Sequence, residues 1–285
     1  MNNMQFQDNE HTLSHEQKIW KASACFLYAI RPFALYVMLP GLLMCAGMIL
    51  PGKRTAEQMI SGSGNFYYTL GILLTMVILH RRSKKRGYSL WEDATLDYKE
   101  LDKAKTRALV CMGFGFGFFF SALITVVPFP KVLIDSYSGL SNSLNTGTDT
   151  VLALISTIIL APLAEEIIFR GYMLNRLMSW FSEKHSIWIS SVIFALCHVS
   201  PIWIAYALVM GAFLAKVSIK EDNIAHSVIL HMGFNLNVLP IWIIHRIPSL
   251  ESVLFANHIL IAGYGAVALG MGIWHLKKYR KETEK

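Results

Sequence analysis

Polar side chains that can carry charge or donate hydrogen bonds occur inside apolar stretches in the second half of this chain. They are Glu165, Glu166, Arg170, His198, His231 and Asn235. A charged group at the centre of a bilayer costs at least about 2.5–3.5 kcal/mol on insertion scales, so each such group is a candidate for function. Groups of these types serve in proton relays, in ion pairs and at sites where a substrate is bound.

The spacing of these residues indicates which side chains can meet. Adjacent residues on an α-helix point about 100° apart, so Glu165 and Glu166 face different directions. Arg170 follows Glu166 by four residues and can pair with it on one helix face. Glu165 has no cation on its own helix, so it must meet another helix, face a water-filled cavity or carry a proton. His231 and Asn235 are also four residues apart and share a face.

The predicted depths of the polar residues are similar. With a rise of about 1.5 Å per residue and a hydrocarbon core of about 30 Å, Glu165, His198, His231 and Asn235 lie roughly 9–16 Å from the cytoplasmic boundary. Considered one at a time, these groups have ordinary structural explanations. Glu166 and Arg170 would form a helix-stabilising ion pair. The histidines and the asparagine would form hydrogen bonds between helices. Their convergence on one layer instead favours a single buried site.

The composition predicts an all-α, polytopic transmembrane bundle. Hydrophobic residues make up 54% of the 285 and charged residues 16%, with a mean hydropathy of +0.42, whereas soluble domains carry about 25% charged residues. About eight spans are predicted, at 33–50, 58–80, 107–127, 151–169, 187–199, 202–219, 224–244 and 253–275. The fifth span, at 187–199, is short and ends near Ser200-Pro201, where the proline predicts a break between two helices. Residues 18–32, which mix aromatic and basic side chains, are predicted to lie in the interface.

The distribution of basic residues predicts the orientation. Of the 26 Lys and Arg residues, only Lys53, Arg54, Lys131 and Arg246 fall in predicted outer segments if both termini are cytoplasmic. This asymmetry accounts for the net charge of +7 without a nucleic-acid partner. It fits the plasma membrane of a bacterium, and it also fits the endoplasmic reticulum; the short chain favours the bacterial alternative.

Four segments are predicted from the positions of spans and polar residues. Residues 1–32 form a cytoplasmic or interfacial segment, and residues 33–150 form the first transmembrane helices, with a basic cytoplasmic loop at 81–106. Residues 151–244 form a helical core that contains the polar residues. Residues 245–285 form the last span and a basic cytoplasmic tail.

Three short motifs in order resemble the signature of a known family. They are Glu165-Glu166-x-x-x-Arg170, Phe194-x-x-x-His198 and His231-x-x-x-Asn235. This pattern is similar to that of the CPBP family, which includes the type II CAAX prenyl proteases and the bacterial bacteriocin-processing or self-immunity proteins, also called the Abi family. The resemblance covers about 151–244.

The resemblance implies an intramembrane endopeptidase that acts on a peptide or protein in or at the lipid bilayer. Carried over to this chain, Glu165 and His198 would activate a water, while His231 and Asn235 would stabilise the oxyanion. The neighbouring carboxylate–guanidinium pair would hold the shape of the site. The family is also commonly labelled a metalloprotease, and Glu165, His198 and His231 would suffice as a zinc set. Because no HExxH motif is present, we favour the metal-independent glutamate mechanism.

Two other functions remain open from the sequence. The chain could be a non-catalytic bacteriocin self-immunity or scaffold protein, in which case Glu165→Ala would leave the cellular phenotype intact. It could also be a transporter, since intramembrane Glu and His mark proton paths. The absence of duplicated halves and the confinement of the polar cluster to one half of the membrane argue against a transporter.

Overall fold

The fold consists of helices throughout the part of the chain that the structure describes. The computed structural model describes residues 15–49, 56–137, 150–249 and 258–283. Along the chain the elements are α2 (His15–Ile49), α3 (Ala56–Lys85), α4 (Leu90–Asp93), η1 (Tyr98–Glu100), α5 (Lys103–Val126), α7 (Thr150–Ile155), η2 (Ser156–Leu160), α8 (Ala161–Glu166), η3 (Ile167–Leu174), α9 (Asn175–Met178), α10 (Glu183–Leu196), α11 (Pro201–Glu221), α12 (Ile224–Leu236), α13 (Val238–His245) and α15 (His258–Thr283). The predicted all-α membrane bundle is therefore confirmed.

Several of these helices are long and apolar enough to cross a membrane. By length and composition, five described segments qualify: Lys21–Ile49, Lys103–Val126, Val151–Met178, Pro201–Glu221 and Ile224–Ile244. The chain is thus a multi-pass membrane protein. The count of eight spans and the cytoplasmic position of both termini stay predictions.

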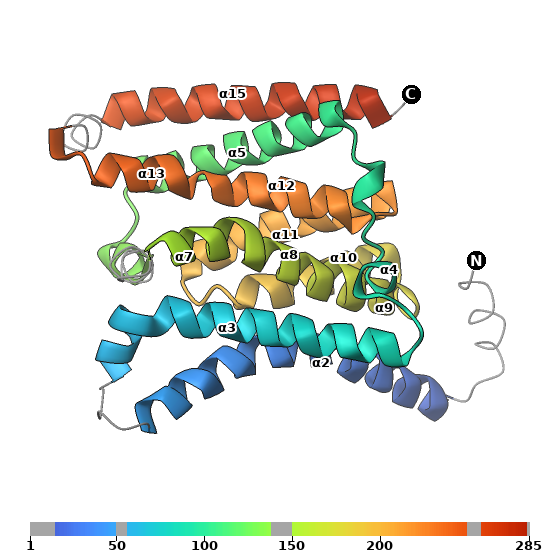
Figure 1. Ribbon diagram of the computed structural model, residues 1–285. Helices are drawn as coiled ribbons and strands as arrows, with labels where there is room; N and C mark the ends of the chain where they lie inside the picture. Colours follow the sequence, from blue (N-terminus) through green and yellow to red (C-terminus); the bar gives the residue numbers. More distant parts are fainter. Residues whose placement is uncertain (1–14, 50–55, 138–149, 250–257, 284–285) are drawn as a thin grey trace.

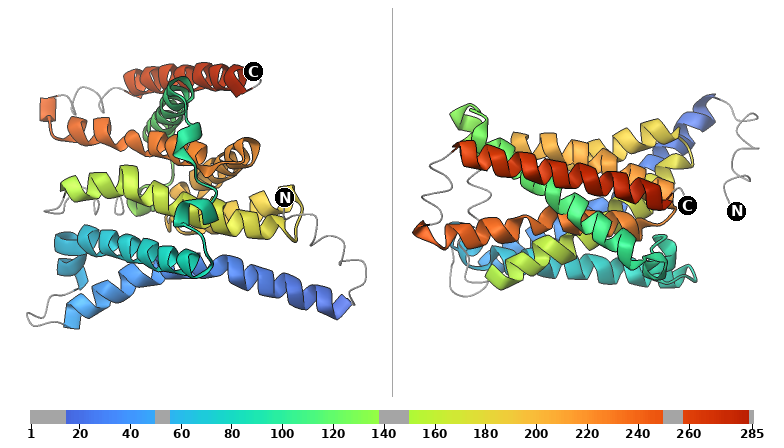
Figure 2. Two further views of the ribbon diagram at one scale, coloured as in Figure 1. Left: turned by 45° about the vertical axis from the view of Figure 1, so that its right-hand side comes forward. Right: turned by 90° about the horizontal axis from the view of Figure 1, so that it is seen from above.

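Helix α2 differs from the prediction for the N-terminal segment. Residues 18–32, which are predicted to lie in the interface, are continuous with the first apolar helix, so the predicted segment boundary at residue 32 falls inside α2. Pro32 and Pro40 both lie within this helix, and α2 bends in its middle (Figure 2, left). A proline removes one backbone hydrogen bond and clashes with the preceding turn, which accounts for a bend of this kind.

The helices pack in layers that enclose the middle of the chain. Helices α2 and α3 lie on one side, α7 to α11 occupy the centre, and α12, α5 and α15 follow on the other side (Figure 1). Glycines allow close contact between α5 and α12: a Cβ at Gly113 would clash with the Leu230 carbonyl and lie 2.7 Å from the Phe234 nitrogen. Small residues at such crossings are typical of helix packing in membranes. Seen from above, α15 crosses α5 obliquely (Figure 2, right).

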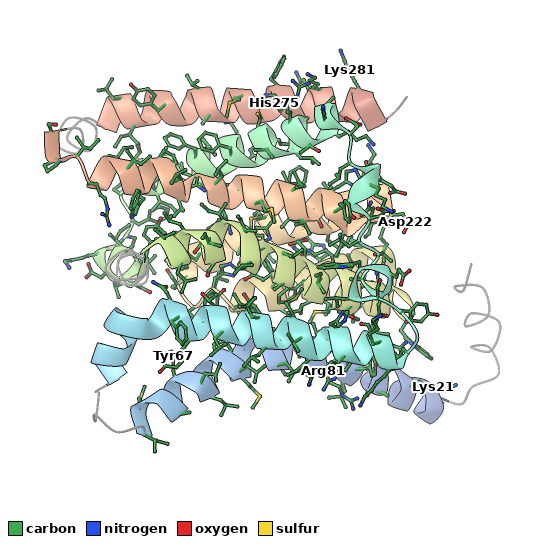
Figure 3. All side chains as sticks on the ribbon, viewed as in Figure 1. Lys21, Tyr67, Arg81, Asp222, His275 and Lys281 are labelled. Carbon is green, nitrogen blue, oxygen red and sulfur yellow. The ribbon has the colours of Figure 1, made fainter. Side chains whose placement is uncertain are left out.

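The connections at one end of the bundle are tied together by polar contacts. The N–H of Ile224 donates to the Thr95 carbonyl at 3.0 Å, and the Asn223 side chain donates to the Asp97 carbonyl at 2.7 Å. Lys105, at the start of α5, pairs with a carboxylate at the end of α11. Figure 3 shows Lys21, Asp222 and Lys281 toward this right-hand end and Tyr67 toward the opposite one. This end carries the segments that the distribution of basic residues predicts to be cytoplasmic.

Candidate active site

The rod from α7 to α9 positions the first polar motif, and it contains two π-helical stretches. These are η2 and η3, which flank the short α-helix α8. Pro162 lies at the start of α8 and has no N–H for the carbonyl four residues earlier, which lies in η2. The wider π turns leave backbone carbonyls available to other partners, and such turns are frequent at functional sites.

A fully buried ion pair lies at the centre of the bundle. Glu166 Oε1 accepts hydrogen bonds from Arg170 Nη1 at 2.7 Å and from His231 Nδ1 at 2.9 Å. Arg170 also donates to the Gly211 carbonyl at 2.9 Å, and its guanidinium lies 4.6 Å from the centroid of the Phe194 ring. The ion pair expected from the spacing is therefore present. The polar contacts extend to α12, because Glu166 Oε1 also binds and orients the His231 ring.

Glu165 faces other helices, as its lack of an intrahelical cation predicted. Its side chain is 13% exposed, and its Oε1 accepts a hydrogen bond of 2.6 Å from the Tyr36 hydroxyl of α2. The Tyr36 hydroxyl lies in turn 2.8 Å from that of Tyr68 on α3. Oε2 of Glu165 lies 3.8 Å from His231 Nε2, which is longer than a hydrogen bond. One carboxylate oxygen is therefore held by a donor, and the other is left without one among these groups.

His198 lies in the turn directly after α10, so the end predicted for the span at 187–199 is three residues too late. Helix α10 ends at Leu196 and α11 begins at Pro201, so the predicted helix break is present. His198 Nδ1 lies 3.1 Å from the Phe194 carbonyl. A carbonyl only accepts, so Nδ1 carries the proton and Nε2 of the neutral ring keeps a lone pair.

The turn after His198 has an uncommon backbone conformation. Val199 has a φ of 60°, in the left-handed region, where a β-branched residue is a steric outlier. Such strain costs about 1–3 kcal/mol and persists only where the surrounding structure enforces it. The Ser200 N–H donates to the His198 carbonyl at 2.6 Å and closes the turn. The chain thus leaves α10 sharply, directly after the histidine.

Asn235 lies near the C-terminal end of α12, one turn after His231. Its Nδ2 donates to the Thr157 carbonyl at 2.8 Å, and Thr157 lies in the π-helical segment η2. This contact orients the side-chain amide. An amide nitrogen carries two hydrogens, so the second remains available for another acceptor.

One cavity joins all four predicted catalytic residues. It has a volume of about 600 Å³ and is lined by Glu165, His198, His231 and Asn235. Tyr36 and Tyr68 also line it, together with the aromatic side chains of Trp203, Tyr206 and Trp242. The side chains therefore converge from α8, the α10–α11 turn and α12, as their predicted depths suggested.

Comparison with known proteins bears on the same segment. Residues 147–237 match the family model described as type II CAAX prenyl endopeptidase Rce1-like. The chain carries an Rce1-like domain. The resemblance to the CPBP family is thereby confirmed over this segment, and the match supports the general class of a CAAX-type intramembrane endopeptidase. The match covers about a third of the chain, and no curated protein and no solved structure matches it.

The Rce1-like domain does not contain all the residues that contact the polar cluster. Tyr36 and Tyr68 come from α2 and α3, outside the matched range. The sequence did not single out these two tyrosines, because the apolar cores of α2 and α3 contain almost no ionisable residues. A tyrosine inside an apolar helix was nonetheless a usable signal, since a buried tyrosine hydroxyl usually has a hydrogen-bond partner.

The positions of the possible ligands decide whether the site fits zinc. Among the described residues, no group of three or more His, Cys, Asp and Glu side chains is arranged to hold a metal ion. Glu165, His198 and His231 line one cavity but do not form such a group. The residues as positioned therefore do not fit the zinc set.

Proposed function

We propose that this chain hydrolyses a peptide bond in a membrane-associated peptide or protein, with a water activated by Glu165 and His198. The observation that carries this proposal is the shared cavity, in which both residues and the donors of α12 surround one space inside a helical bundle. The Rce1-like domain supports the class of reaction. The processing would be of the CAAX type or would remove a leader from a peptide such as a bacteriocin.

Glu165 and His198 are suited to act on the same water. Glu165 Oε1 is occupied by the Tyr36 hydroxyl, so Oε2 is the oxygen that can accept a proton from water. His198 Nε2 keeps a lone pair because Nδ1 donates to the Phe194 carbonyl. A positioned general base contributes about 10²–10⁴-fold to a rate. The glutamate would then return the proton to the leaving nitrogen as the peptide bond breaks.

Asn235 and His231 are suited to stabilise the oxyanion of the tetrahedral intermediate. The second Nδ2 hydrogen of Asn235 is available because only one is donated to Thr157. His231 gives its Nδ1 hydrogen to Glu166, so its Nε2 can donate only when the ring carries both protons. That protonated form would balance the buried charges. The carboxylates of Glu165 and Glu166 would then face two cations, the guanidinium of Arg170 and the imidazolium of His231.

The remaining predictions on organisation form part of the proposal. Residues 151–244 would be the catalytic core. Residues 1–32 would be a cytoplasmic or interfacial segment, residues 33–150 would complete the bundle, and residues 245–285 would supply the last span and a basic tail. The polar end of the bundle would face the cytoplasm. A bacterial plasma membrane is the proposed location.

The proposal is tested with protein purified in detergent, with its metal content determined. Wild type, Glu165→Ala, His198→Ala and the control Glu183→Ala are incubated with a quenched library of membrane-compatible peptides. Glu183 is exposed at the start of α10 and does not line the cavity. We expect cleavage by wild type and by the control, and none by the two cavity variants. If wild type cleaves nothing and Glu165→Ala still complements a cellular phenotype, the immunity or scaffold function takes the place of proteolysis.

A further inference from the structure

Two tyrosine hydroxyls reach the glutamate of the Rce1-like domain from helices outside that domain. The Tyr36 side chain is almost fully enclosed, with 5% of the residue exposed, and its hydroxyl lies 2.6 Å from Glu165 Oε1. The Tyr68 hydroxyl lies 2.8 Å from that of Tyr36. The residues are separated from Glu165 by about a hundred positions or more in sequence, so the contact exists only because α2 and α3 pack beside α8.

The chemistry of the three groups fixes the direction of these hydrogen bonds. An ionised carboxylate only accepts, so the Tyr36 hydroxyl donates its hydrogen to Glu165. Its oxygen is then available as an acceptor, and the Tyr68 hydroxyl is the donor to it. The 2.6 Å contact falls in the range of charge-assisted O–H···O⁻ bonds, which are about twice as strong as neutral ones. A chain of such bonds strengthens each member, because each donor is polarised by the next.

We propose that Tyr36, supported by Tyr68, is a positioning residue that holds Glu165 with its Oε2 turned to the cavity. This inference rests on the proposed function, because it concerns how the general base is oriented. It assigns to α2 and α3, which lie outside the matched family range, a part in completing the site.

The position of His231 explains why such a restraint matters. Its Nε2 lies 3.8 Å from Glu165 Oε2, and a small rotation of the carboxylate would bring the two into hydrogen-bonding distance. A direct bond would engage the oxygen that must take the proton from water, and would also engage the nitrogen proposed for the oxyanion. The Tyr36 hydroxyl holds the other oxygen and so keeps Glu165 apart from His231.

Phenylalanine substitutions separate the hydroxyls from the packing of the rings. The Tyr36 and Tyr68 rings contact each other edge to face, with centroids 6.5 Å apart, and Phe retains this contact. The variants are Tyr36→Phe, Tyr68→Phe and the double variant. The matched control is Tyr67→Phe, which removes a hydroxyl one position away on α3, from a residue that does not line the cavity.

The test measures kcat and KM separately on a peptide that wild type cleaves, with the thermal midpoint of each variant recorded. We expect Tyr36→Phe to lower kcat by about 10- to 100-fold with KM within about twofold, because a hydrogen bond to a charged group is lost. Tyr68→Phe should lower kcat less. The double variant should match Tyr36→Phe, since Tyr68 acts through Tyr36, and the control should match wild type.

Several outcomes would overturn the inference. An unchanged kcat in Tyr36→Phe would do so, and so would a raised KM with unchanged kcat, which would make the hydroxyl a substrate contact. If Tyr36→Phe did not fold, an unchanged kcat in Tyr68→Phe would decide against the inference. Cleavage by wild type that Glu165→Gln abolishes would leave the proposed function standing in each of these cases. Failure of wild type to cleave any peptide would overturn both.

Discussion

The buried pair of Glu166 and Arg170 should respond to single and double substitution in different ways. Glu166→Gln removes the anion that contacts the buried guanidinium directly. Arg170→Met removes the cation and leaves the carboxylate with His231 as its remaining partner. The combined Glu166→Gln/Arg170→Met variant removes both charges and leaves neither uncompensated.

The expected magnitudes follow from the burial of the pair. The side chains are 0% and 1% exposed, so solvent gives almost no screening of a charge that is left alone. Breaking a buried pair by removing one partner costs about 3–5 kcal/mol, whereas replacing both partners is often close to neutral. We therefore expect each single variant to lose about 3–5 kcal/mol of its free energy of unfolding. The loss in the double variant should be smaller than the sum of the two single losses by about 1–3 kcal/mol. Arg170→Met also loses the bond to the Gly211 carbonyl, in the single and double variants alike.

The assay is unfolding in mixed micelles by titration with a denaturing detergent, followed by tryptophan fluorescence and far-ultraviolet circular dichroism. Activity on a cleavable peptide is measured in parallel. The double variant should recover part of its stability but not its activity, because His231 loses the carboxylate that orients it. Losses of stability that add up in the double variant would refute the reasoning, since they would show that the two side chains do not interact energetically.

Three further predictions concern the oxyanion donor, the helix packing and the role of metal. Asn235→Ala should lower kcat by about 10²–10³-fold, the effect of removing one oxyanion donor; a change confined to KM would contradict this role. Gly113→Ala should reduce stability by about 1–3 kcal/mol in the same unfolding assay, because its Cβ would press on the backbone of α12. Gly263→Ala is the control, since nothing lies within 4 Å of its Cβ, and equal losses in both would refute the packing argument. Cleavage should persist in excess chelator, and a loss that added zinc restores would contradict the glutamate mechanism.

Hydropathy predicted the helical bundle because the requirement for about 20 apolar residues per span is visible in one dimension. Each predicted span overlaps an observed helix or series of helices. The boundaries were less accurate where the backbone departs from regular geometry. The turn that holds His198 and the π-helical stretch that orients Asn235 arise from local strain and from contacts between helices. Neither feature has a periodic signature in the sequence.

The helical spacing predicted the contacts within one helix and not those between helices. Glu166 and Arg170 pair as expected from their separation of four residues. The second partner of Glu166, His231, comes from α12, and its contribution depends on how α12 packs against the central rod. Tyr36 was not predicted because tyrosine is ordinary in a membrane helix, and only the folded bundle shows that its hydroxyl meets a carboxylate.

The central claim is that Glu165 and His198 act on one water as a single catalytic unit. The most direct test compares kcat/KM for wild type, Glu165→Gln, His198→Ala and the double variant on one peptide in reconstituted bilayers. Groups that act as a unit are strongly non-additive in such comparisons. We predict that each single variant loses nearly all activity and that the double variant is no slower than the slower single one. Losses that multiply in the double variant, or cleavage that survives Glu165→Gln, would contradict the account.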